Sequence, residues 1–134
     1  MQAGLLRVKL THLDEFNQER NVIANRYLKE LKNDLLRMPK VRPGADSSWH
    51  QFVVHVKKEK RDELMNYLKQ REIGTIIHYP IPPHLSKAYA YLGKKIGDYP
   101  IAEQYADEVL SLPMYNGMTK VEQETVIRAI NEFK

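Results

Sequence analysis

A short apolar run that passes directly into a proline-rich segment constrains the fold of this chain more than any other feature. Residues 75–77 (Thr-Ile-Ile) predict a short strand, and His78 and Tyr79 lie at its end. Three prolines follow within residues 80–83. Because proline fixes φ and lacks an amide donor, neither a helix nor a sheet can continue there. A stiff segment after a strand holds polar side chains at fixed positions, so His78 and Tyr79 are candidates for a binding site.

Apolar periodicity elsewhere predicts several helices and two more strands. A capping box of Thr119 and Glu122 opens the last helix. Pro39 is expected to end a long N-terminal helix, since proline disfavours helical geometry in the residue before it. The predicted helices are residues 1–38, 58–72, 88–92, a stretch that starts near Asp98 and ends before Pro113, and the helix after Thr119. The predicted strands are residues 52–56, 75–77 and 110–112.

These elements predict the fold class α+β, with a small antiparallel sheet of about three strands packed with helices and preceded by a long N-terminal helix. We expect residues 1–38 to form that helix and residues 39–134 to form one small α+β domain. The apolar stripe of the helix is already running by Leu5 and Leu6, with no capping residue before it. That pattern favours a chain cut from a larger protein.

Composition excludes several classes of protein. Cysteine is absent, so no disulfide or thiolate metal site forms, and the five histidines show no metal-ligand pairing: His12, His50, His55, His78 and His84. There is no run of about 18 apolar residues and no signal peptide, so we expect a cytoplasmic protein without a membrane partner. The net charge is +4, but the basic residues are scattered among acids, so we expect no nucleic-acid partner.

Four segments of the chain resemble one known family in order and spacing. Residues 73–85 are similar to its His-Tyr-Pro-x-Pro-x-His stretch, and residues 102–114 to a segment that starts Ala-Glu and ends Leu-Ser-Leu-Pro-Met. Residues 1–14 resemble its Gln-Ala-Ala-x-Leu helix, and residues 49–54 its His-x-Phe/Tyr strand. The family is the DegT/DnrJ/StrS family of sugar aminotransferases. The resemblance covers nearly the whole chain, which matches only the C-terminal part of such an enzyme.

The resemblance implies the small domain of a fold-type I aminotransferase, with residues 1–38 as the tail of the interdomain connection. It implies a parent enzyme that uses pyridoxal phosphate to transfer an amino group, typically from glutamate, to a keto-sugar nucleotide. The products of such enzymes are amino sugars for polysaccharide biosynthesis, including lipopolysaccharide. It also implies a homodimeric parent whose Schiff-base lysine lies upstream. We therefore expect this chain to have no catalytic residue, to hold no cofactor and to be inactive alone.

The same resemblance implies that His78, Tyr79 and His84 bind the substrate. Without it, the favoured interpretation of His78 and Tyr79 is a strand-end histidine bonded to a backbone carbonyl beside a packed tyrosine. His84 is equally consistent with a solvated loop residue. Two other functions stay open, namely a non-catalytic domain that binds a nucleotide sugar and a domain that binds protein or nucleic acid.

Overall fold

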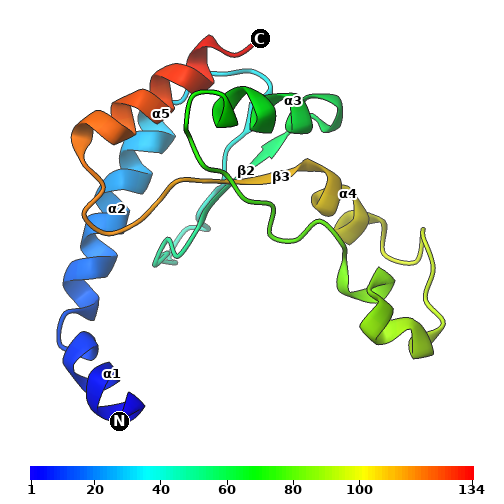
Figure 1. Cartoon of the computed structure of the whole chain (residues 1–134), viewed down its shortest axis with the longest axis horizontal. Coiled ribbons are helices and arrows are strands. Elements are labelled where there is room, and N and C mark those ends of the chain that lie inside the picture. The colour runs from blue at the N-terminus through cyan, green and yellow to red at the C-terminus, as the bar shows by residue number, and fades with distance from the viewer.

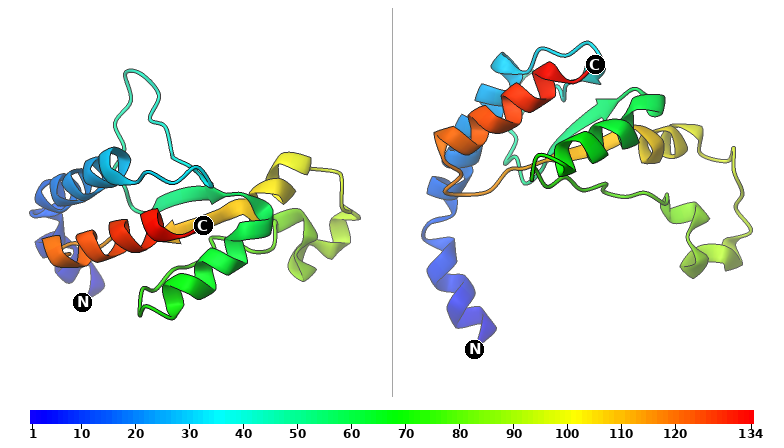
Figure 2. Two further views of the ribbon diagram at one scale, coloured as in Figure 1. Left: turned by 90° about the horizontal axis from the view of Figure 1, so that it is seen from above. Right: turned by 45° about the horizontal axis from the view of Figure 1, so that its top comes forward.

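The computed structural model describes residues 1–134, apart from the side chain of Lys58 (Figure 1). The elements along the chain are α1 (Gln2–Leu10), α2 (Leu13–Glu30), β1 (Leu36–Arg37), β2 (Phe52–Val56), α3 (Lys58–Lys69), the 3₁₀ helices η1 (Pro83–Leu85) and η2 (Lys87–Leu92), α4 (Pro100–Glu108), β3 (Val109–Leu112) and α5 (Lys120–Glu132). Residues 83–99, which we call the lobe, extend from one side of the sheet, and α1 extends from the other (Figures 1 and 2).

The sheet has the strand order β1-β2-β3, and both pairings are antiparallel. The register places Phe52 opposite Leu112 and His55 opposite Val109. Every residue of β3 is buried, whereas β2 alternates between buried and half-buried positions. The predicted fold class, α+β with a small antiparallel sheet of three strands, is confirmed.

The sequence predicts two of the three strands correctly, and the third differs. Residues 75–77 contribute a single bridge, in which Ile76 and Ser111 exchange backbone hydrogen bonds of 3.3 and 2.8 Å. The prolines of residues 80–83 remove donors that longer pairing would need. The remaining strand is β1, which pairs with the other edge of β2. A strand of two residues is too short to show a periodic pattern, so it cannot be found from apolar spacing.

The expectation of one helix over residues 1–38 is wrong in its extent. The helix breaks between α1 and α2, where the Thr11 hydroxyl donates to the carbonyl oxygen of Val8 at 2.7 Å. His12 then leaves helical geometry, with φ of −109°. The second helix ends at Glu30, well before the expected end.

Asn33 explains why α2 stops early. Its side-chain amide donates to the carbonyl oxygens of Ile130 and Phe133 at 2.7 and 2.8 Å. Because the last carbonyl groups of a helix lack helical donors, this side chain caps the end of α5. The chain has to leave helical geometry after Glu30 to bring Asn33 there, and Leu31 is accordingly extended, with φ of −72° and ψ of 117°.

One core joins α2, α3, α5 and the sheet, and α2 and α5 lie side by side (Figures 1 and 2). Tyr27 of α2, Phe52 of β2, Leu64 of α3 and Ile130 of α5 are all fully buried. Burial raises the pKa of the Tyr27 hydroxyl, which donates to the carbonyl oxygen of Pro113 at 2.9 Å. The second half of α2 therefore packs in the same core as the sheet. The division of the chain into two parts at residue 38 stays a prediction.

The predicted capping box at the start of α5 is confirmed. The Thr119 hydroxyl accepts a hydrogen bond from the Glu122 amide at 3.2 Å, and the Glu122 carboxylate accepts one from the Thr119 amide at 2.7 Å.

Replacing Thr119 by alanine should lower the free energy of unfolding by about 1 kcal/mol, because an amide at the start of α5 loses its acceptor. Urea denaturation followed by circular dichroism measures the change. Thr125→Ala is the matched control. The Thr125 hydroxyl donates to the carbonyl oxygen of Val121 within α5, a contact that adds little to helix stability. Equal losses in the two variants would show that the cap contributes nothing.

Apolar side chains are exposed on α1. No residue of this helix is buried, and the exposed fractions of Leu5, Leu6, Val8 and Leu10 lie between 64% and 66%. Apolar side chains that gather on one exposed helix normally mark an interaction surface, so we expect α1 to contact further protein. Among the described helices, none has the length and apolar character needed to cross a membrane.

Candidate functional site

His78 is attached to the sheet through its side chain. The Ile76 bridge to Ser111 brings the segment after residue 74 against β3, and His78 follows two residues later. The Nδ1 atom of His78 then lies 2.9 Å from the Oγ atom of Ser111. The imidazole is half-buried, and Ser111 is buried. One edge of the ring is thus held by β3. Among the described residues, Nε2 on the other edge has no protein partner.

A hollow of about 180 Å³ lies beside this histidine. We call it the His78 hollow. The loop before β2 contributes two of its polar side chains, His50 and Gln51, and the extended segment contributes Thr75. Its full lining is His50, Gln51, Gly74, Thr75, Ile76, His78, Ser111, Leu112, Pro113 and Met114. Neutral donors and acceptors converge here, and the lining contains no lysine and no carboxylate among the described residues.

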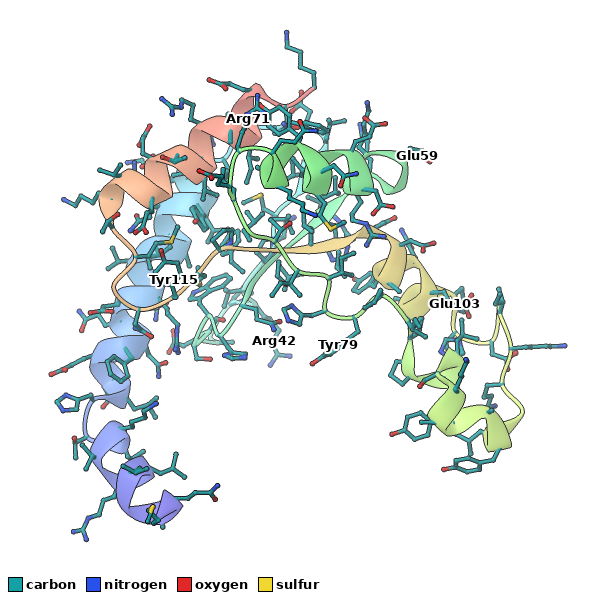
Figure 3. All side chains as sticks on the ribbon, viewed as in Figure 1. Arg42, Glu59, Arg71, Tyr79, Glu103 and Tyr115 are labelled. Atoms are coloured by element: carbon teal, nitrogen blue, oxygen red, sulfur yellow. The ribbon has the colours of Figure 1, made fainter. Side chains whose placement is uncertain are left out.

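Tyr79 lies next to the His78 hollow and points outward. Its ring is perpendicular to that of His78 at a centroid distance of 5.5 Å, and its exposed fraction is 72%. The peptide bond between the two residues is cis. Figure 3 shows the Tyr79 side chain projecting from the ribbon into the open space between the sheet and the lobe. The structure therefore brings His78 and Tyr79 together, with the phenol available to a ligand.

His84 lies in a different cluster. Its Nε2 atom is 3.0 Å from the Glu103 carboxylate, and its ring packs at 4.8 Å against Tyr99. The Gly97 amide donates to both oxygens of the same carboxylate at 3.0 Å. The Tyr99 amide donates to one of these oxygens at 3.3 Å. His84 lines a separate hollow of about 380 Å³ in the lobe. Its observed contacts hold the lobe together, and a substrate contact by His84 stays a prediction.

The Glu103 carboxylate gives the lobe a pH dependence. The Gly97 amide is the main cause that lowers the pKa of Glu103, and the hydrogen bonds from His84 and Tyr99 add to it. Because the pKa of Glu103 is lowered in the folded chain, its ionised carboxylate stabilises the fold fully at pH values above the ordinary pKa of a glutamate. This stabilisation is lost as the pH falls through the lowered pKa of Glu103.

Replacing Glu103 by glutamine should speed hydrogen exchange of the Gly97 and Tyr99 amides at neutral pH, because the charged acceptor is removed. Acidification of the wild-type chain should likewise lower the protection factors of these two amides, which compare their exchange rates with those of an unfolded chain at the same pH. Amide exchange followed by NMR measures both. Glu132→Gln, at an exposed residue near the end of α5, is the control and should change neither amide. Unchanged exchange in Glu103→Gln would show that the carboxylate does not order the lobe.

His55 has an acidic neighbour that the sequence does not reveal. Its Nδ1 atom lies 3.5 Å from the Glu108 carboxylate without forming a hydrogen bond, and its ring packs at 4.4 Å against Tyr105. Burial and the positive charge of Arg37 lower the pKa of His55. Across the described residues, no group of three His, Cys, Asp or Glu side chains is placed to hold a metal ion.

Comparison with known proteins identifies the family. A sequence model of the DegT/DnrJ/EryC1/StrS aminotransferase family matches residues 1–131. The chain belongs to this aminotransferase family. It is 44% identical over 131 residues to the erythromycin biosynthesis sensory transduction protein EryC1 of Saccharopolyspora erythraea, and the match covers 97% of this chain and 35% of the relative.

Two further proteins show the same partial match. The chain is 42% identical over 133 residues to the dTDP-3-amino-3,6-dideoxy-alpha-D-galactopyranose transaminase of Aneurinibacillus thermoaerophilus, covering 99% of this chain and 36% of the relative. The crystal structure of S. venezuelae DesV in complex with a ketimine intermediate matches with a TM-score of 0.91 and 42% identity. That match covers 98% of this chain and 35% of DesV. The chain thus spans about a third of the length of these three relatives.

In this aminotransferase domain, one sequence motif contains His78 and Tyr79, but the residues that surround them in space cannot be read from that motif. Ser111, His50 and Gln51 enter the His78 hollow from parts of the chain distant in sequence. One signal for Ser111 is present, because it is the only polar residue in a four-residue strand of otherwise apolar character. A hydroxyl at a buried strand position calls for a hydrogen-bond partner.

Proposed function

We propose that this chain is the substrate-binding part of a sugar aminotransferase, in which His78 and Tyr79 contact a keto-sugar nucleotide. The observation that carries the proposal is the pair of adjacent donors beside the His78 hollow, in a chain of the aminotransferase family. The relative from Aneurinibacillus thermoaerophilus is named for a dTDP-linked amino sugar. A nucleotide-linked sugar is therefore the substrate class that we assign to this chain.

The chemistry of the two side chains supports that assignment. The Nδ1 atom of His78 is taken up by Ser111, so Nε2 is the ring atom left for a ligand. An imidazole N–H and a phenol O–H both donate hydrogen bonds, and phosphate and sugar oxygens accept them. Hydrogen bonds to a charged phosphate are stronger than those between neutral groups. His78 and Tyr79 thus suit the diphosphate or the sugar of such a substrate.

The cofactor of the proposed enzyme is pyridoxal phosphate, which supplies the electron sink for amino-group transfer. It requires a lysine for the Schiff base and an acidic partner for the ring nitrogen. The lining of the His78 hollow contains neither group among the described residues. The residues of this hollow do not fit the cofactor, and we assign its binding to the part of the enzyme outside this chain. We accordingly propose that the chain alone transfers no amino group.

The activity of the whole protein rests on the family and on the share of its relatives that this chain spans. We infer transfer of an amino group from glutamate to the keto-sugar nucleotide, for amino-sugar and polysaccharide biosynthesis including lipopolysaccharide. We further infer a homodimer in the cytoplasm, with no nucleic-acid or membrane partner. The exposed apolar surface of α1 is consistent with a chain that contacts further protein.

Joining this chain to the remaining part of a relative tests the proposal. The chain would replace the matching third of the Aneurinibacillus thermoaerophilus transaminase, with which it is 42% identical. The joined protein should aminate the keto-sugar nucleotide of that enzyme, while the chain alone should not. Cofactor absorbance reports whether the joined protein has folded. A folded joined protein that binds nucleotide but aminates nothing would favour a non-catalytic binding domain instead.

A further inference from the structure

Ser111 is a buried polar residue whose backbone is already occupied. It lies in β3 with an exposed fraction of 7%, and its amide and carbonyl groups both pair with Ile76. Its hydroxyl is therefore the only polar group of Ser111 left without a backbone partner. A buried hydroxyl is costly unless it forms a hydrogen bond. Its side-chain contact in the described chain is the Nδ1 atom of His78, at 2.9 Å.

The direction of this hydrogen bond follows from the surroundings. If Nδ1 carried the proton and donated to Oγ, the hydroxyl hydrogen would need another acceptor, and among the described residues His78 is its one hydrogen-bond partner. If the hydroxyl donates to Nδ1, every polar group of Ser111 is satisfied. A ring nitrogen that accepts a hydrogen bond carries no proton, so the proton of a neutral imidazole lies on the other nitrogen. For His78 that nitrogen is Nε2.

We infer that Ser111 is a positioning residue that holds His78 as the Nε2–H tautomer and fixes the rotation of its ring. The consequence for ligand binding rests on the function proposed above. An Nε2–H group donates to a phosphate or sugar oxygen, whereas the other tautomer would present a lone pair to it. Ser111 thus acts on the substrate through His78, without touching the substrate itself.

The tautomer can be measured directly, without any ligand. Ring ¹⁵N chemical shifts of His78 would be recorded in the 134-residue chain at a pH where the imidazole is neutral. We expect the wild-type ring to be protonated at Nε2 and not at Nδ1. In Ser111→Ala the two nitrogen resonances should move toward each other, because both tautomers become populated. In Ser111→Cys the separation of the two resonances should be intermediate between that of the wild-type chain and that of Ser111→Ala, since a thiol is a weak donor.

Two controls separate this effect from a general loss of structure. Ser48→Ala, at an exposed serine two residues before His50, should leave the His78 nitrogen shifts unchanged. The Ile76 and Ser111 amides should stay protected from exchange in Ser111→Ala, which shows that the bridge survives. Protonation of Nδ1 in the wild-type chain would overturn the inference. So would His78 shifts that are the same in the wild-type chain and Ser111→Ala.

A double-mutant cycle tests whether Ser111 acts through His78. Binding of thymidine diphosphate would be measured for Ser111→Ala, His78→Ala and the double variant. Loss of one neutral hydrogen bond should weaken binding by about 2- to 10-fold in Ser111→Ala. The double variant should bind no more weakly than His78→Ala, because the two changes remove one unit. Losses that multiply would contradict the inference. If His78→Ala leaves binding unchanged, the proposed function fails, and the nitrogen shifts still decide the role of Ser111.

Discussion

Replacing Phe52 by alanine should lower the free energy of unfolding of this chain by about 3–5 kcal/mol, the usual range for removing a buried aromatic ring. Phe52 is fully buried. Its ring packs edge-on against Tyr27 at 5.2 Å and stacks on Trp49 at 5.4 Å. Phe52 also pairs with Leu112 across β2 and β3. The substitution therefore leaves a cavity where α2, the loop before β2 and the sheet meet.

Small domains are stable by only about 5–15 kcal/mol, so this single change removes a large fraction of the total. Trp49 is the only tryptophan and stacks on the deleted ring, so its fluorescence in a urea titration reports the transition. Ile81→Ala is the control, because Ile81 is 58% exposed and its truncation should cost less than about 0.5 kcal/mol. Equal stability of the two variants would contradict the placement of Phe52 in the core.

Replacing His78 by alanine should weaken the binding of thymidine diphosphate by about 1.5–3 kcal/mol, the scale of a hydrogen bond to a charged group. That loss corresponds to about a 10- to 150-fold higher Kd. The reason is that the donor at Nε2 disappears while the hollow and Tyr79 remain. Isothermal titration of the chain measures the affinity, and circular dichroism shows that the variant is folded.

Two controls accompany this substitution. His12→Ala removes an exposed histidine that contacts Glu15 and Phe16 and lies at the junction of α1 and α2, so it should leave binding unchanged. Thymidine, which lacks the diphosphate, should lose little affinity in His78→Ala. An affinity for thymidine diphosphate that His78→Ala does not change would remove His78 from the site.

Local patterns predict much of this fold, because they depend on residues that are close in sequence. The capping box at Thr119 involves residues of a single helix turn, and the structure confirms it. Contacts between distant residues cannot be found in this way. Asn33 ends α2 early because it caps α5, close to one hundred residues away. The two-residue strand β1 likewise exists only because β2 offers it an edge.

The candidate site shows the same limit. His78 and Tyr79 are adjacent in sequence, so one motif is enough to find both. Ser111 meets His78 only through the register of the sheet, because the two residues are 33 positions apart along the chain. His84 is near His78 in sequence, but its bond to Glu103 draws it into the lobe. Proximity along the chain therefore groups His84 with a hollow that the structure separates from it.

The central claim is that the His78 hollow binds the nucleotide part of a sugar nucleotide, and an NMR titration tests it most directly. The amide signals of the ¹⁵N-labelled chain would be followed as thymidine diphosphate is added. Even weak binding with a Kd of about 1 mM, a binding free energy of only about −4 kcal/mol, gives chemical shift changes that saturate.

If the claim is correct, the shifts saturate and concentrate at residues 50–51, 74–79 and 111–114, and His78→Ala largely abolishes them. Shifts confined to the lobe or to α1, or shifts that persist unchanged in His78→Ala, would contradict it.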